Sequence, residues 1–127
     1  AGLALDLYVP QFGGWAFTKS AAGRFVDTNC RDYGFIVRYP SYGEKQTGIP
    51  YEPWHLRYVG LPHSQIIMDE YLTLEEYIDL LKPGSFYQYG SYLISHQNGR
   101  VIDAPSGWKH VTVSEDNLGG YLFTWEL

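Results

Sequence analysis

The sequence changes character at Lys82-Pro83-Gly84, and this change limits the folds open to the chain. Before it, short apolar strands alternate with helical patterns, whereas residues 85–127 carry strand patterns separated by turn residues. Proline removes a backbone donor and glycine permits a left-handed backbone, so these residues end the preceding helix. We therefore predict an α+β chain with an antiparallel sheet and flanking helices, followed by a small all-β appendage.

The first 84 residues show local signals for both helix and strand. Residues 3–9 alternate apolar and polar side chains with a period of two, which is typical of a half-buried strand. Helical spacing predicts a helix over residues 16–32, with Thr18 or Ser20 as its N-cap and Gly34 at its C-terminal end. Thr73 and Glu76 form a capping box that starts another helix. Further expected elements are a strand at 35–39, a loop or hairpin tip at 40–47 and an extended segment at 51–59.

The last 43 residues are predicted to form a small sheet. Asn98-Gly99 is the strongest local hairpin signal, joining strands at 92–97 and 100–103. Two more strands are expected at 111–114 and 121–125. Two histidines, His96 and His110, are interpreted as surface residues. Four aromatic residues could stack on sugar, but a core face is the favoured interpretation: Phe86, Tyr87, Tyr89 and Tyr92.

The composition removes several classes of protein. Hydrophobic residues make up 45% and charged residues 18% of the chain, which argues against intrinsic disorder. The net charge of −5 argues against nucleic acid as a partner, because phosphates require a basic surface. No run approaches the roughly 18 apolar residues that a transmembrane segment needs. The single cysteine, Cys30, excludes an internal disulfide framework and a cysteine-based zinc site.

Glu52 and His55 stand three residues apart, and two interpretations are open. In the first, His55 is a hydrogen-bonded core histidine and Glu52 is a surface carboxylate. In the second, His55 binds zinc through a ring nitrogen and Glu52 accepts a proton beside the metal. Asp6 is a second candidate ligand, on the polar face of the first strand, where a solvated carboxylate is the simpler interpretation.

Three segments of the sequence resemble a known family. The run EPWHLRYVG at residues 52–60 resembles the second signature of the zinc D-alanyl-D-alanine carboxypeptidases of the VanY type. Residues 2–6 (GLALD) match the last five positions of their first signature, Ser-x-His-x-x-Gly-x-Ala-x-Asp. The segment YGFIVRYP at residues 33–40 is similar to the part between the two signatures. The resemblance covers residues 1 to about 82 well and the tail weakly.

This resemblance implies a hedgehog/DD-peptidase-like fold and a role for each matching residue. Asp6 and His55 correspond to two zinc ligands, and Glu52 corresponds to the catalytic acid and base. Trp54 is expected to wall the substrate site, and Tyr39 to border it. Zn²⁺ is therefore the expected cofactor, and residues 1–84 are expected to be the C-terminal part of a catalytic domain, with residues 85–127 as the appendage.

The first histidine of the family motif would stand two residues before Ala1. We therefore expect the chain to be the C-terminal portion of a larger zinc peptidase and to be inactive alone. Its expected partner is the upstream half of the same protein, possibly as a separate chain. The substrate class implies an extracytoplasmic location, in the cell wall or anchored to the membrane through an N-terminal segment outside this sequence.

The predicted function is hydrolysis of the terminal D-Ala from peptidoglycan stem peptides, in cell-wall metabolism or glycopeptide resistance. The stem peptide ending in D-Ala is the expected substrate. One alternative is an L,D-carboxypeptidase of the same fold. Another is a non-catalytic wall-binding module that lacks a complete zinc site.

Overall fold

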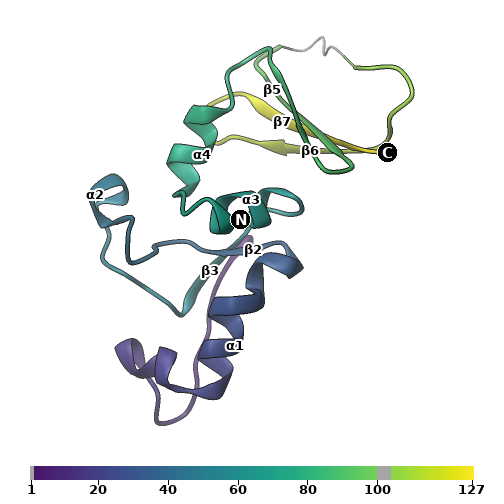
Figure 1. Cartoon of the computed structure of the whole chain (residues 1–127). Coiled ribbons are helices and arrows are strands. Elements are labelled where there is room, and N and C mark those ends of the chain that lie inside the picture. Colours follow the sequence, from purple (N-terminus) through teal and green to yellow (C-terminus); the bar gives the residue numbers. More distant parts are fainter. Residues whose placement is uncertain (1, 100–103) are drawn as a thin grey trace. The chain divides into compact units, whose positions relative to one another are not determined.

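The computed structural model describes residues 2–99 and 104–127 and divides into two compact units (Figure 1). The first unit is Ala1–Tyr77 and the second is Ile78–Leu127. The structure thus divides within a helix, a few residues before the change of sequence character at residue 84. Among the described residues, every helix is too short or too polar to cross a membrane.

A three-stranded antiparallel sheet organises the first unit. Its strands are β1 (Ala4–Asp6), β2 (Phe35–Val37) and β3 (His55–Tyr58), arranged in the order β1-β3-β2. The register places Asp6 directly opposite His55 and Leu5 opposite Leu56. Side chains on directly opposite residues share one face of a sheet, so Asp6 and His55 project from the same face.

The helices of the first unit are short. They are the 3₁₀ helix η1 (Gly14–Lys19), α1 (Ala21–Asn29), the 3₁₀ helix η2 (Cys30–Tyr33), α2 (Glu44–Thr47), α3 (His63–Asp69) and α4 (Leu74–Leu80), of which the last runs into the second unit. The sequence analysis did not foresee α3, and it expected a loop or hairpin tip where α2 forms.

The single helix expected over residues 16–32 is wrong, because the chain breaks at Ser20. This residue has an extended backbone, with φ −74° and ψ 153°. Its hydroxyl donates to Phe17 O at 2.7 Å and accepts from Gly23 N at 2.9 Å, so one side chain ends η1 and caps α1. A Cβ at Gly23 would lie 2.0 Å from Phe17 O, so glycine is required where the two helices meet.

Two predicted helix ends are confirmed. Glu76 N donates to Thr73 Oγ1 at 3.2 Å, and Thr73 N donates to Glu76 Oε2 at 2.8 Å, which completes the capping box. Gly34 follows η2 with φ 84°, a left-handed conformation that favours glycine. Gly60 and Val59 both donate to Gly34 O, so this turn also ties η2 to the end of β3.

The core of the first unit lies between the sheet and the helices. Its most deeply buried apolar side chains include Phe17, Ile36 and Ile67. Exposure rises across one face of the sheet, from 4% at Val37 in β2 to 39% at Leu5 in β1. The half-buried strand expected at residues 3–9 is therefore largely exposed, because β1 is an edge strand and the contacts of η2 and α3 fall on β2.

The second unit is a four-stranded antiparallel sheet in the order β4-β5-β7-β6. The strands are β4 (Phe86–Tyr89), β5 (Tyr92–Gln97), β6 (Lys109–Glu115) and β7 (Tyr121–Glu126). The last two confirm the predicted strands at 111–114 and 121–125. The hairpin predicted at Asn98-Gly99 depends on residues 100–103, which lie outside the described residues.

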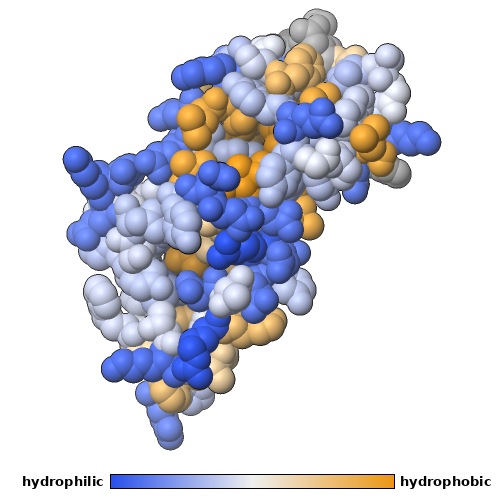
Figure 2. Space-filling view, viewed as in Figure 1, coloured by the Kyte–Doolittle hydropathy of each residue, from blue (hydrophilic) through white to orange (hydrophobic). Residues whose placement is uncertain are grey.

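Two interpretations of side chains in this unit are wrong. His96 is 6% exposed rather than on the surface, because it bonds to Asp116. Phe86 and Tyr89 are 42% and 41% exposed, so these two aromatics do not form a closed core face. Apolar side chains also reach the surface from β6, and Figure 2 shows such side chains over this unit. The side chain of His110 lies outside the described part of the chain.

Candidate functional site

Asp6 and His55 meet on one face of the sheet in the first unit. Asp6 Oδ1 lies 2.5 Å from His55 Nδ1, which follows from their opposite positions on β1 and β3. The carboxylate is 67% exposed and the imidazole is 24% exposed. The pair therefore stands at the surface of the sheet, where a ligand can reach its free lone pairs.

Glu52 and Trp54 lie in the turn that leads into β3. His55 N donates to Glu52 O at 3.1 Å, and Glu52 N donates to Tyr39 O at 3.0 Å. Trp54 O accepts from Leu7 N at 2.8 Å, just beyond β1. Backbone hydrogen bonds therefore tie this turn to the chain segments that follow β1 and β2, and these segments carry the other candidate residues.

Tyr39 packs its ring against the imidazole of His55. The ring centroids are 5.4 Å apart and the planes differ by 11°, so the two rings are stacked. The guanidinium carbon of Arg38 lies over the Tyr39 ring, 4.9 Å from its centroid. Arg38 in turn forms a bidentate ion pair with Glu75 at the start of α4.

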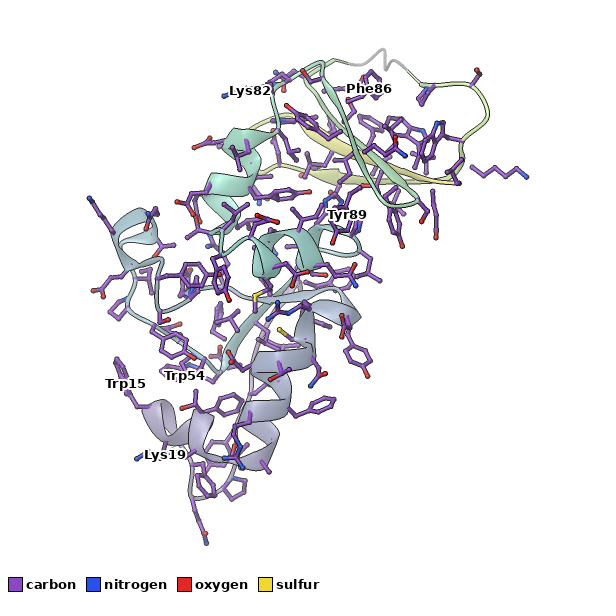
Figure 3. All side chains as sticks on the ribbon, viewed as in Figure 1. Trp15, Lys19, Trp54, Lys82, Phe86 and Tyr89 are labelled. Atoms are coloured by element: carbon purple, nitrogen blue, oxygen red, sulfur yellow. The ribbon has the colours of Figure 1, made fainter. Side chains whose placement is uncertain are left out.

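Trp15 is an exposed aromatic residue beside the candidate site that the sequence analysis did not single out. Its side chain is 70% exposed, and its ring meets Tyr51 edge to face at a centroid distance of 6.5 Å. Tyr51 directly precedes Glu52, so Trp15 lies beside the segment that carries Glu52 and Trp54 (Figure 3). The only local signal was an aromatic residue after the Gly13-Gly14 pair, which does not itself indicate a site.

The donor atoms at Asp6 and His55 fit zinc in type. Zinc accepts carboxylate oxygen and imidazole nitrogen, and a catalytic site uses three protein ligands with one open position. Within residues 2–99 and 104–127, no group of three His, Cys, Asp or Glu side chains comes together. The described residues therefore bring together two side chains of the types that zinc accepts.

The buried histidines of the described chain are engaged elsewhere. His63 Nδ1 lies 2.8 Å from the hydroxyl of Tyr77, and burial lowers the pKa of His63 to about 4. His96 bonds to Asp116 within the second unit. Neither residue joins Asp6 and His55 in a group of three possible metal ligands within the described part of the chain.

The sequence of this chain is similar to that of known D-alanyl-D-alanine carboxypeptidases. Residues 1–61 match the family model described as VanY, D-alanyl-D-alanine carboxypeptidase. A D-alanyl-D-alanine carboxypeptidase of Enterococcus faecium is 36% identical over 136 residues, covering 98% of this chain and 42% of that protein. The chain thus spans less than half the length of this curated relative.

Solved structures agree with the sequence comparison. The D,D-dipeptidase VanXYg, in complex with a D-Ala-D-Ala phosphinate analog, has a TM-score of 0.81 and 28% identity, covering 99% of this chain and 56% of that one. A VanY D,D-pentapeptidase mutant from a VanB-type resistance cassette, in complex with Zn(II), has a TM-score of 0.51 and 38% identity, covering 61% of this chain and 42% of that one. The predicted α+β, hedgehog/DD-peptidase-like fold is confirmed by these likenesses.

Proposed function

Because residues 1–61 belong to the VanY family of D-alanyl-D-alanine carboxypeptidases, we propose that the protein removes the terminal D-Ala from peptidoglycan stem peptides. The observation that carries the proposal is the meeting of Asp6 and His55, 2.5 Å apart, beside the turn that holds Glu52. A zinc-bound relative and a relative bound to a D-Ala-D-Ala analog support the metal and the substrate class.

In this proposal Asp6 Oδ1 and His55 Nδ1 hold zinc, and the third ligand is a histidine that precedes the printed sequence. When bound, zinc would supply Lewis-acid polarisation of the scissile carbonyl and of the attacking water. The site would lie in the portion of a catalytic domain formed by residues 1–84, with residues 85–127 as an appendage. A site completed from upstream also agrees with the exposure of Asp6, whose side chain is 67% exposed.

Glu52 is the proposed general base and acid. Its carboxylate accepts a proton from the attacking water and returns that proton to the leaving amine of D-Ala. Trp54 walls the substrate site, and Tyr39 borders it. The exposed ring of Trp15, beside Tyr51, extends this aromatic wall. Because the substrate lies outside the cytoplasmic membrane, the proposed location is extracytoplasmic, in or near the cell wall.

A stem-peptide assay on the protein in its natural length tests this function. Pentapeptide and tetrapeptide stems are incubated separately with the wild type, with Glu52→Gln and with the control Glu44→Gln, which changes an exposed carboxylate of α2. Products are weighed by mass spectrometry and bound zinc is measured. We expect Glu52→Gln to lose about 10²–10⁴-fold in D-Ala release while it keeps its zinc, and Glu44→Gln to match the wild type.

The same assay separates the alternatives. Unchanged turnover in Glu52→Gln would exclude Glu52 as the acid and base. Cleavage of the tetrapeptide stem instead of the pentapeptide would favour an L,D-carboxypeptidase. A wild type with neither zinc nor D-Ala release would favour a non-catalytic wall-binding module.

A further inference from the structure

The imidazole of His55 contacts Asp6 through a ring nitrogen and lies nearly parallel to the ring of Tyr39. Asp6 contacts one of its ring nitrogens, but a single contact does not fix both side-chain torsions, χ1 and χ2, that orient the ring. The near-parallel ring of Tyr39, 5.4 Å away with an interplanar angle of 11°, removes this freedom. The direction of the nitrogen lone pair, which a metal ligand must control, is thus set by two neighbours.

Tyr39 is held on its backbone as well as by its ring. Arg38 N donates to His55 O at 3.0 Å, which continues the pairing of β2 and β3 up to Tyr39. Tyr39 O accepts from Glu52 N at 3.0 Å. A single residue therefore carries the ring that packs on His55 and the carbonyl that fixes the backbone of Glu52.

Arg38 connects the Tyr39 ring to a helix. Its guanidinium lies over the ring at 4.9 Å from the centroid, and both of its terminal nitrogens donate to Glu75 at the first turn of α4. The arginine side chain is 17% exposed and the glutamate side chain 43%. Although partial burial acts to raise the pKa of Glu75, the hydrogen bonds from Arg38 hold it below its ordinary value, so the carboxylate stays ionised.

We propose that Tyr39, braced by the Arg38–Glu75 ion pair, is a positioning residue that orients the His55 imidazole for metal binding. This rests on the proposed zinc site, and it assigns Tyr39 a role that does not depend on contact with substrate. Supports of this kind, in which one side chain orients a metal ligand, typically change metal affinity about 10–100-fold when removed.

Two measurements on the protein in its natural length test the proposal. Zinc dissociation constants are compared for the wild type, Tyr39→Phe, Tyr39→Leu and Glu75→Gln, with Tyr33→Leu as a matched control on a 65% exposed tyrosine. In the metal-free protein, the carbon-bound ring protons of His55 are followed by NMR, because a stacked aromatic ring shifts them upfield. Melting temperatures are recorded alongside.

We expect Tyr39→Leu to bind zinc about 10-fold more weakly and to lose the upfield shift, with Tyr39→Phe and Tyr33→Leu close to the wild type. Glu75→Gln should give a smaller loss in the same direction. Unchanged zinc affinity in Tyr39→Leu overturns the proposal, as does equal weakening in Tyr39→Phe. If the wild type binds no zinc, the proposed function fails; the NMR arm then decides separately, and unchanged His55 shifts in Tyr39→Leu overturn the positioning role.

Discussion

Each unit of the molecule holds a histidine bonded to an aspartate, and the two pairs have opposite surroundings. In the first unit His55 Nδ1 lies 2.5 Å from Asp6 Oδ1, and in the second His96 Nε2 lies 2.6 Å from Asp116 Oδ2. The side chains of His55 and Asp6 are 24% and 67% exposed, whereas those of His96 and Asp116 are 7% and 2% exposed. The two pairs thus differ greatly in solvent exposure but hardly at all in the distance between nitrogen and oxygen.

The buried pair of the second unit already has its hydrogen bonds filled. Asp116 Oδ1 accepts from Leu118 N at 2.7 Å and from Gly120 N at 2.8 Å, while Oδ2 faces His96. His96 Nδ1 lies 2.8 Å from Leu81 O, which can only accept, so this nitrogen donates to the carbonyl and both ring nitrogens are engaged within the unit. A Cβ on Gly120 would lie 2.5 Å from Asp116 Oδ2, so there is no room for another group.

This difference shows what separates a ligand site from a structural pair. The residue types are the same and the nitrogen–oxygen distances are nearly equal in the two pairs, so these features do not distinguish them. The exposed pair keeps lone pairs that a metal can reach, whereas the buried pair spends every donor and acceptor within the fold. We therefore expect substitutions in the buried pair to change stability and substitutions in the exposed pair to change zinc binding.

The largest expected effect is on the buried pair. Asp116→Ala should lower the free energy of unfolding by about 3–5 kcal/mol, because it leaves the buried His96 imidazole and two backbone amides without their hydrogen-bond partner. Urea unfolding followed by the fluorescence of Trp125, which is 4% exposed in β7, measures the loss. The control Asp79→Ala, on an exposed residue of the same unit, should stay within about 0.5 kcal/mol. A loss below about 1 kcal/mol in Asp116→Ala would contradict the assignment of a buried ion pair.

A third histidine extends the comparison, because the buried His63 places its Nδ1 against the hydroxyl of Tyr77. Burial lowers its pKa from 6.5 to about 4, so between these values the unfolded chain binds a proton that the folded protein excludes. The stability that His63 contributes is therefore present above pH 6.5 and is lost as the pH falls toward 4, by about 3 kcal/mol in all.

Urea unfolding at pH 7 and at pH 4.5, where most of the loss has occurred, measures this effect, and NMR titration of the His63 ring identifies its source. His63→Gln, which cannot take up the proton, should show a smaller dependence on pH across this range. A His63 pKa at or above 6.5 in the folded protein would contradict the expected direction.

How much of the fold and of the candidate site could be predicted from the sequence depends on how many residues separate the side chains that interact. The capping box of Thr73 and Glu76 and the left-handed Gly34 are local, and both are confirmed by the structure. The pairing of Asp6 with His55 joins residues 49 positions apart, and only the family signatures indicated that they belong together. His96 was misplaced because its partner stands 20 residues further on, in a turn-rich segment without a recognisable pattern.

The elements that sequence reasoning missed depend on tertiary contacts of polar residues. Ser20 interrupts a helical pattern because its hydroxyl bonds both to the turn before it and to the turn after it. Helix α3 begins with His63 and Ser64, which are buried and bond to Tyr77 and to Arg31 O. Sequence patterns predict buried polar residues of this kind to lie on the surface, because their hydrogen-bond partners cannot be identified from the sequence alone.

Zinc binding provides the next test, on the exposed pair. Asp6→Ala should weaken zinc binding at least about 100-fold, since loss of a mere supporting residue already reaches 10–100-fold. Because the Asp6 side chain is 67% exposed, the free energy of unfolding of the metal-free protein should change by only about 0.5 kcal/mol. Calorimetric zinc titration measures the first effect and urea unfolding the second. Asp27→Ala, on an exposed residue of α1, serves as the control. Zinc binding as tight in Asp6→Ala as in the wild type would break the proposed contrast between the two pairs.

The smallest expected effect belongs to a local device, the capping box at the start of α4. Thr73→Val keeps the shape of this side chain, which is 1% exposed, but removes the hydroxyl that accepts from Glu76 N. We expect a loss of about 1 kcal/mol in the free energy of unfolding, the usual magnitude for an N-cap, measured by urea unfolding. Glu76→Gln keeps an acceptor for Thr73 N and should change the stability by less than half as much. If Thr73→Val instead lowers the free energy of unfolding as much as Asp116→Ala does, a local helix cap would contribute as much stability as the buried His96–Asp116 pair. The buried pair would then no longer stand out as the larger contribution.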